Sequence, residues 1–171
     1  MPGQLVDYRV QDGLAVMELN QPPANTYNYE MMRELDEAIL TAHLDEAVHV
    51  LIVRGKGEKF FSVGADINML AGANPRLKYY FCLHANETLM RLDQTPKLVI
   101  AALNGHTAGG LEIAMACDIR IARRDATGAE IPLAEGLALE RELRQRLFES
   151  GDAAEGLAAY VNKTVPRFEG I

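Results

Sequence analysis

Short apolar segments alternate with amphipathic helical segments along the first three quarters of the sequence, and this order leaves few folds open. Strands are expected where apolar and β-branched residues form short runs, at residues 5–10, 14–19, 48–53, 98–103 and 118–122. Helices are expected where apolar residues recur at helical spacing, at residues 29–44, 75–92 and 111–117. Gln11-Asp12-Gly13 predicts a hairpin turn between the first two strands. The whole order predicts an α/β layer with parallel strand pairing and right-handed crossovers.

The last quarter of the chain differs from the rest. Two helical segments, residues 133–149 and 152–163, follow one another without a strand between them. We therefore expect an α/β core over residues 1–126 and a C-terminal helical segment over residues 127–171. The length of 171 residues suits one domain with a small appendage.

Charge and composition narrow the class of partner. The 17 Lys and Arg residues against 24 Asp and Glu residues give a net charge of −7, which argues against a dominant nucleic-acid surface. The N-terminus shows no signal peptide, and the longest apolar run, residues 98–103, is too short to span a membrane. Cys82 and Cys117 both lie in apolar stretches, which predicts buried thiols in a reducing compartment. We expect a cytoplasmic protein that binds neither nucleic acid nor membrane.

Two turns of small residues, Val63-Gly64-Ala65-Asp66 and Ala108-Gly109-Gly110, each follow an expected strand and open an expected helix. The first N–H groups of a helix have no partner within the helix, and small residues let a ligand oxygen approach them. Two such turns side by side could direct two N–H groups at one oxygen and form an oxyanion hole, which stabilises negative charge on a carbonyl oxygen. The alternative is that both are only tight connections between strand and helix.

Glu112 is an acidic residue within an otherwise small and apolar helical segment, residues 111–117. Burying a carboxylate is costly unless it is paired or used, and an apolar surrounding should raise its pKa toward that of a general acid or base. The alternative is a first-turn Glu that faces water and interacts favourably with the helix dipole.

Other chemistries lack support in the sequence. No grouping of His, Cys and Asp has the spacing of metal ligands, so no metal site is expected. Neither glycine-rich turn matches a phosphate loop or the dinucleotide-binding fingerprint. Ser62 lacks the surroundings of a nucleophile elbow, which argues against an acyl-enzyme. His106 lies in the second turn and is a further candidate for lining a site.

The two turns lie within longer stretches that resemble the crotonase (enoyl-CoA hydratase/isomerase) superfamily. These stretches are FFSVGADI at residues 60–67 and IAALNGHTAGGLEIAMACD at residues 100–118. NQPPAN at residues 20–25 resembles the family's early acyl-CoA-binding loop, and residues 132–170 resemble its C-terminal helices. Together these stretches cover most of the chain, and their order along the chain is far more specific than either turn alone.

The resemblance implies a crotonase-like β-β-α spiral with C-terminal helices, assembled as a homotrimer or a dimer of trimers. It implies an acyl-CoA thioester as substrate, with coenzyme A as part of the substrate and no separate cofactor. The N–H groups of Ala65 and Gly109 would form the oxyanion hole, and Glu112 would match the first of two catalytic glutamates. The residues expected to line the bound thioester are Ala24, Thr26, Val63, Gly64, Asp66, Ile67 and Gly110.

The activity that the resemblance implies is that of an enoyl-CoA hydratase, a lyase that adds water across the 2,3-double bond in fatty-acid or related breakdown. Two alternatives stay open. One is an isomerase, decarboxylase or hydrolase of the same superfamily, with other acid and base groups. The other is an acyl-CoA-binding remnant without catalysis.

The sequence departs from the family pattern at two places. The glycine run before Leu111 is one residue shorter than usual, and a loss there could displace an N–H group. After Ala126 the family continues with a block that holds its second catalytic glutamate, and this block is absent. Glu135 resembles that glutamate only superficially, so we do not assign it the role. Either the polypeptide is deleted at both places, or disordered loop residues are missing from the sequence.

Overall fold

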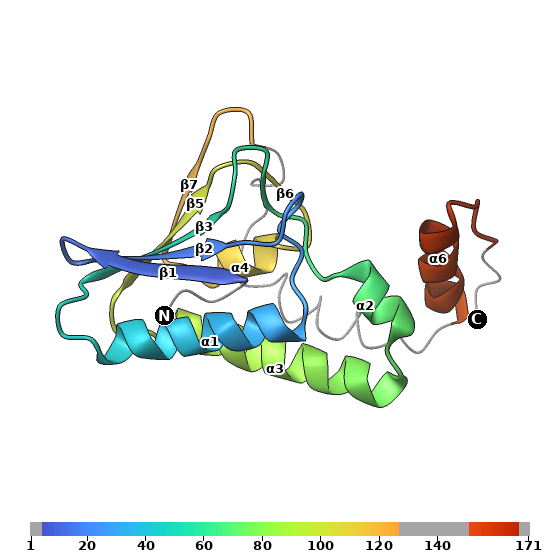
Figure 1. Cartoon of the computed structure of the whole chain (residues 1–171), viewed down its shortest axis with the longest axis horizontal. Helices are drawn as coiled ribbons and strands as arrows, with labels where there is room; N and C mark the ends of the chain where they lie inside the picture. Colours follow the sequence, from blue (N-terminus) through green and yellow to red (C-terminus); the bar gives the residue numbers. More distant parts are fainter. Residues whose placement is uncertain (1–4, 127–150, 168–171) are drawn as a thin grey trace. The chain divides into compact units, whose positions relative to one another are not determined.

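The computed structural model describes residues 5–126 and 151–167 (Figure 1). The chain divides into two compact units. The first comprises Met1–Ala65 and Phe81–Ile131, and the second comprises Asp66–Tyr80 and Pro132–Ile171. The predicted domain boundary after residue 126 lies at the edge of the part that is not described. The predicted helix at residues 133–149 lies outside the described residues. Both stay predictions.

A five-stranded sheet with the order β1-β2-β3-β5-β7 forms the centre of the first unit (Figure 1). Its strands are β1 (Val6–Gln11), β2 (Leu14–Leu19), β3 (Val50–Gly55), β5 (Leu98–Leu103) and β7 (Ile119–Ala122). The first two strands pair antiparallel as the predicted hairpin, and all other neighbours pair parallel. The predicted α/β layer with parallel pairing is thereby confirmed.

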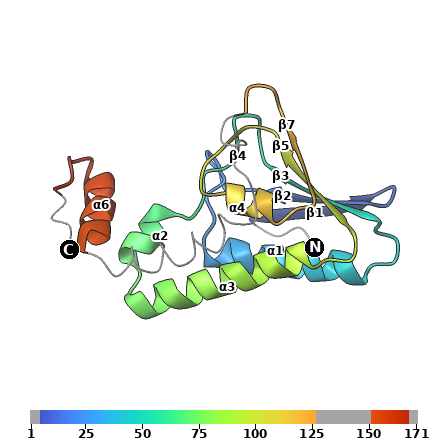
Figure 2. The same ribbon diagram turned by 180° about the vertical axis from the view of Figure 1, so that it is seen from behind.

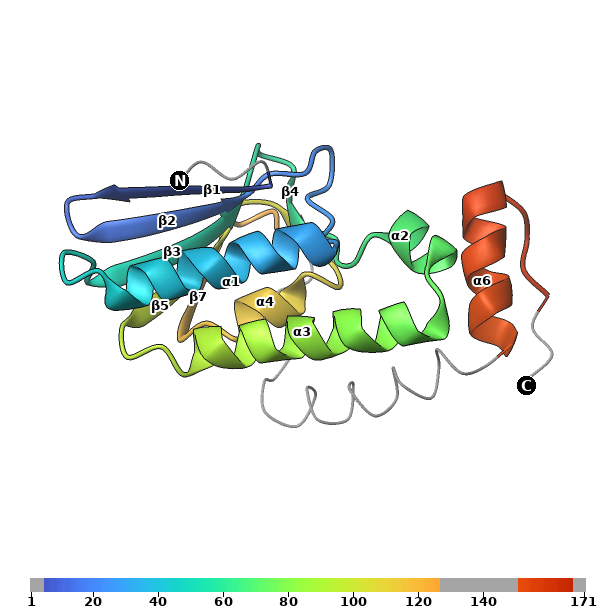
Figure 3. The same cartoon turned by 60° about the horizontal axis from the view of Figure 1, so that its bottom comes forward.

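Helices α1 (Tyr29–Leu44), α3 (Pro75–Asp93) and α4 (Leu111–Met115) lie on one face of this sheet (Figures 2 and 3). Within the first unit, α1 and the main part of α3 run side by side, joined by an ion pair of 2.7 Å between Arg91 and Asp36. The apolar stripe of α1 is fully buried, at Met31, Met32, Leu35, Ile39 and Ala42. Buried side chains of these helices therefore form much of the apolar core of the first unit.

A second sheet of two strands, β4 (Phe60–Ser62) and β6 (His106–Thr107), lies beyond the carboxyl ends of β3 and β5. The two strands pair parallel. Asn104 fixes this corner, because its side chain accepts from the Gly55 N–H at 2.9 Å and donates to the Gly57 carbonyl at 2.7 Å. The sequence predicted a strand before the first turn, which is β4, but it gave no sign of β6, since a two-residue strand leaves no periodic pattern.

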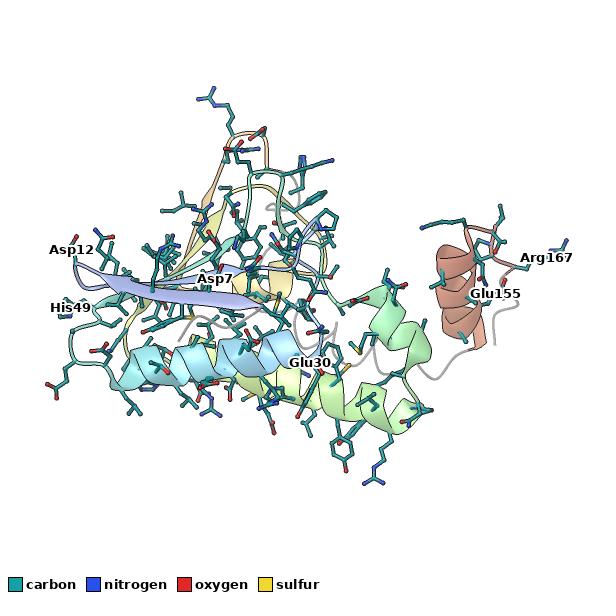
Figure 4. The ribbon with its side chains drawn as sticks, in the orientation of Figure 1. Asp7, Asp12, Glu30, His49, Glu155 and Arg167 are labelled. Carbon is teal, nitrogen blue, oxygen red and sulfur yellow. The ribbon has the colours of Figure 1, made fainter. Side chains whose placement is uncertain are left out.

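The described part of the second unit contains α2 (Ile67–Gly72) and α6 (Gly151–Asn162), which contact one another. The predicted helix at residues 152–163 is confirmed as α6. The Glu155 carboxylate accepts the Arg167 N–H at 3.1 Å, and Figure 4 shows both residues at α6. Within the described ranges, no helix combines the length and apolar character that a membrane crossing requires.

The two cysteines differ in burial, which corrects one expectation. Cys117 is buried as predicted, with 3% of its surface exposed, but Cys82 is only half-buried. No disulfide joins them. Burial raises the pKa of the Cys117 thiol from 9.0 to about 12, and the smaller effects of Arg120 and Asp118 oppose one another.

This raised pKa predicts a pH-dependent stability. The unfolded chain releases the thiol proton near pH 9.0 while the folded chain holds it to about pH 12, so the thiol's contribution to stability is lost as pH rises through that window. The free energy of unfolding of the wild type, measured relative to Cys117→Ala, should fall by up to about 1.4 kcal/mol per pH unit above pH 9. Urea unfolding of both proteins between about pH 8 and about pH 10.5 measures this difference. A constant difference across that range would contradict the prediction.

Candidate active site

The two small-residue turns touch each other through their backbones. The Ala108 N–H donates to the Ser62 carbonyl at 3.2 Å, and the Gly109 N–H donates to the Val63 carbonyl at 3.1 Å. A Cβ built on Gly64 would lie 2.8 Å from the Gly109 Cα. The turns continue the parallel pairing of β4 and β6, so the sheet itself brings Val63-Gly64-Ala65 and Ala108-Gly109-Gly110 together.

The N–H of Ala65 has a direction set by Tyr27. The Gly64 carbonyl accepts the Tyr27 N–H at 2.9 Å, within a parallel bridge that pairs Tyr27 with Ala65. Because a trans peptide holds its C=O and N–H on opposite sides, the Ala65 N–H points away from Tyr27. Within residues 5–126 and 151–167, no backbone carbonyl accepts this N–H. This geometry is compatible with the predicted role of Ala65 as a donor, which stays a prediction.

The two glycine N–H groups of the second turn differ in whether a backbone carbonyl accepts them. The Gly109 N–H, predicted for the oxyanion hole, already donates to Val63. The next N–H, that of Gly110, has no backbone acceptor in the described part of the chain. Gly110 is buried against β4, and a Cβ there would lie 2.3 Å from the Ser62 Cβ. The turn passes directly from Gly110 into α4, with the Leu111 N–H donating to Ala108 at 2.9 Å.

Glu112 lies in the first turn of α4 and is buried, with 6% of its surface exposed. The alternative of a Glu that faces water is therefore wrong. Its neighbours in α4 are buried apolar residues, among them Leu111, Ile113 and Ala114. The structure thus places a buried carboxyl group three residues beyond Gly109.

The early loop packs against the first turn. The Val63 N–H donates to the Ala24 carbonyl at 3.1 Å, and the Thr26 hydroxyl accepts from the Gln21 side chain at 3.2 Å. Asn25, which sequence reasoning did not select, is fully buried and donates from its side chain to the carbonyls of Lys56 and Phe60. A polar residue two positions after a pair of prolines was the only signal for this role.

Asp66 and Ile67 begin the second compact unit. The Asp66 carboxylate caps α2, because it accepts the N–H groups of Asn68 at 2.8 Å and Met69 at 3.3 Å. The expectation that Asp66 and Ile67 line the thioester stays a prediction.

Two further polar residues near the second turn have structural partners. The His106 ring lies edge-on to Phe60, with ring centroids 6.0 Å apart. The Asp118 carboxylate accepts the Val99 N–H at 2.8 Å and so joins the end of the α4 segment to β5. Among the residues with described positions, no group of three or more His, Cys, Asp or Glu side chains could hold a metal ion.

Comparison with known proteins places this geometry in a family. Residues 9–131 match the enoyl-CoA hydratase/isomerase family. The chain is 41% identical over 115 residues to a short-chain-enoyl-CoA hydratase of Clostridium acetobutylicum, and 36% identical over 118 residues to a crotonyl-CoA hydratase of Syntrophomonas wolfei. These matches cover 66% and 68% of this chain but 44% and 45% of the relatives. The chain therefore spans less than half the length of these two curated relatives.

Solved structures show the same architecture. DspI from Pseudomonas aeruginosa matches with a TM-score of 0.70 and 30% identity, over 96% of this chain and 82% of that chain. An enoyl-CoA hydratase from Bacillus halodurans matches with a TM-score of 0.65 and 27% identity, over 71% of this chain and 51% of that chain. The fold and the paired turns define an α/β protein of the crotonase-like fold class. The chain belongs to the enoyl-CoA hydratase/isomerase, or crotonase, family.

Proposed function

We propose that this chain carries the thioester-binding half of an enoyl-CoA hydratase site, which adds water across the 2,3-double bond of an enoyl-CoA. One observation carries the proposal: two strand-to-helix turns in backbone contact, followed at once by a buried glutamate. Amide donors fixed by a sheet need no reorganisation when charge develops on a thioester oxygen, so they stabilise it effectively.

The proposal gives each residue a role. Ala65 supplies one N–H, and the turn of Gly109 and Gly110 supplies the second. Glu112 acts as a general acid or base beside the double bond. Ala24, Thr26, Val63 and Gly64 line the thioester together with Asp66, Ile67 and Gly110. The chemistry also needs a second carboxylate, for which Glu135 lies outside the described residues and is not assigned.

The substrate, the lack of a separate cofactor and the assembly in this proposal follow from the family, while the lack of a metal and the cytoplasmic location follow from the sequence pattern. The substrate is an acyl-CoA thioester, with no separate cofactor or metal. The protein is expected in the cytoplasm as a homotrimer or a dimer of trimers. Its solution mass, measured by light scattering, tests the assembly.

A specific observation supports a second candidate, an acyl-CoA binder without turnover. The Gly109 N–H donates to Val63, so only one turn offers its predicted donor without rearrangement. An isomerase, decarboxylase or hydrolase of the same superfamily would use the same amide donors with other acid and base groups.

One assay series separates these functions. Purified protein is mixed with crotonyl-CoA, and loss of the conjugated double bond is followed by absorbance. Hydration at a rate well above the uncatalysed one supports the hydratase. Binding of crotonyl-CoA in calorimetry without turnover of crotonyl-CoA, 3-enoyl-CoA or malonyl-type thioesters supports the binder. If the protein neither bound nor turned over any of these thioesters, both candidates would be refuted.

A further inference from the structure

Ser62, the last residue of β4, holds a central place between the turns. It is fully buried. Its hydroxyl donates to the Asn25 carbonyl at 2.7 Å and accepts the Gly64 N–H at 3.2 Å. Its own carbonyl accepts the Ala108 N–H at 3.2 Å. One serine therefore binds the early loop, the first turn and the second turn.

The packing around Ser62 is as close as its hydrogen bonding. A Cβ built on Gly110 would lie 2.3 Å from the Ser62 Cβ and 2.5 Å from its hydroxyl oxygen. The backbone of the second turn therefore rests directly on the serine side chain. The Ser62 side chain therefore contacts both turns, Gly64 through the hydroxyl and Gly110 through close packing.

We infer that Ser62 is a positioning residue: its hydroxyl sets the direction of the amide donor in the first turn, while its backbone carbonyl and its side-chain packing hold the second turn in place. The inference rests on the proposed function. The hydroxyl fixes the peptide before Gly64, while Tyr27 fixes the peptide after it. With both flanking peptides held, Gly64 has one conformation, and the Ala65 N–H has one direction.

The same contacts exclude a nucleophilic role for this serine. The hydroxyl proton is donated to the Asn25 carbonyl, and the side chain has no exposed surface. A nucleophile needs a neighbouring base and access to the substrate carbon. Ser62 acts through the peptides that it binds.

The test compares Ser62→Ala with Thr95→Val. Thr95 offers a matched hydroxyl, because it is also buried and donates to a backbone carbonyl, that of Arg91, at 2.9 Å, but it lies before the opposite end of β5. Both variants should lose a similar amount of thermal stability. Only Ser62→Ala should lower kcat for crotonyl-CoA hydration, by about 10- to 100-fold with KM within about threefold, because misplaced donors cost rate at the chemical step. Ser62→Cys, which keeps a weak donor, should restore part of kcat.

A second readout does not depend on activity. Amide hydrogen exchange followed by NMR should be faster at Gly64 in Ser62→Ala than in the wild type. The resonances of Ala65 and Gly110 should shift, while those around Thr95 stay in place. In Thr95→Val, the resonances around Thr95 should shift, while exchange at Gly64 and the resonances of Ala65 and Gly110 stay as in the wild type.

These outcomes distinguish a failure of the proposed function from a failure of the role inferred for Ser62. A wild type that neither binds nor hydrates crotonyl-CoA refutes the proposed function, and the exchange data then still decide whether Ser62 holds the turns. An active wild type whose Ser62→Ala variant loses no more kcat than Thr95→Val overturns the inference. Unchanged exchange at Gly64 overturns it as well.

Discussion

Replacing Glu112 by glutamine is expected to lower kcat for enoyl-CoA hydration by a factor of about 10²–10⁴. Glutamine keeps the size of the side chain and its capacity for hydrogen bonds, but it cannot donate or accept the proton that hydration moves. Because Glu112 is buried on the first turn of α4, the amide fits the same space and folding should be preserved. KM should change by less than about threefold, since in the proposed site backbone N–H groups, and not Glu112, bind the thioester oxygen. Steady-state kinetics with crotonyl-CoA measure both constants.

Glu34→Gln is the matched control for this substitution. Glu34 is a half-buried carboxylate on α1 that accepts the N–H groups of Leu5 and Val6, both at 2.9 Å. A glutamine oxygen can still accept one or both of these bonds, so activity should stay close to that of the wild type. Undiminished turnover in Glu112→Gln would remove Glu112 from the acid or base role. Equal losses in both variants would point to a general effect of charge.

The elements with a long periodic pattern could be predicted from the sequence. The structure has α1 at Tyr29–Leu44 and β5 at Leu98–Leu103, the same bounds that the pattern indicates. Most apolar residues on the inner faces of both elements are buried, while Leu40, Leu44 and Leu98 are exposed, so periodicity reports burial for one face only. β6 was missed because its two residues form a strand only through pairing with β4. Tertiary contact, rather than local preference, makes that strand.

The site was predictable in its position but not in its hydrogen bonding. The sequence suggested two small-residue turns that could lie side by side, and the close approach of Gly64 and Gly109 shows that they do. The sequence could not show that the Gly109 N–H donates to Val63, since this depends on the register between β4 and β6. It also could not show that Ser62 binds Asn25, because 37 residues separate them in the chain. Such long-range polar contacts leave no local signal.

Replacing Gly64 by alanine is expected to lower both the stability of the fold and its activity strongly. Gly64 has φ +106°, which an alanine adopts only with strain, and its Cβ would lie 2.8 Å from the Gly109 Cα. Strain of this kind costs on the order of 1–3 kcal/mol, and forced overpacking costs about the same again. We therefore expect the free energy of unfolding to fall by about 2–6 kcal/mol. Urea unfolding measures this change.

Gly64→Ala should also lower kcat at temperatures where the variant is folded. The added Cβ pushes Gly109 away, and a displacement of donors near 1 Å can lower the rate about 100-fold. Gly57→Ala isolates the backbone strain, because Gly57 also has a positive φ, +82°, but no atom lies within 4 Å of its Cβ position. That variant should lose roughly 1–2 kcal/mol of stability and keep its kcat at temperatures where it is folded. If Gly64→Ala matched Gly57→Ala in both stability and kcat, the contact between the two turns would not matter for catalysis, and the paired-turn site would have to be given up.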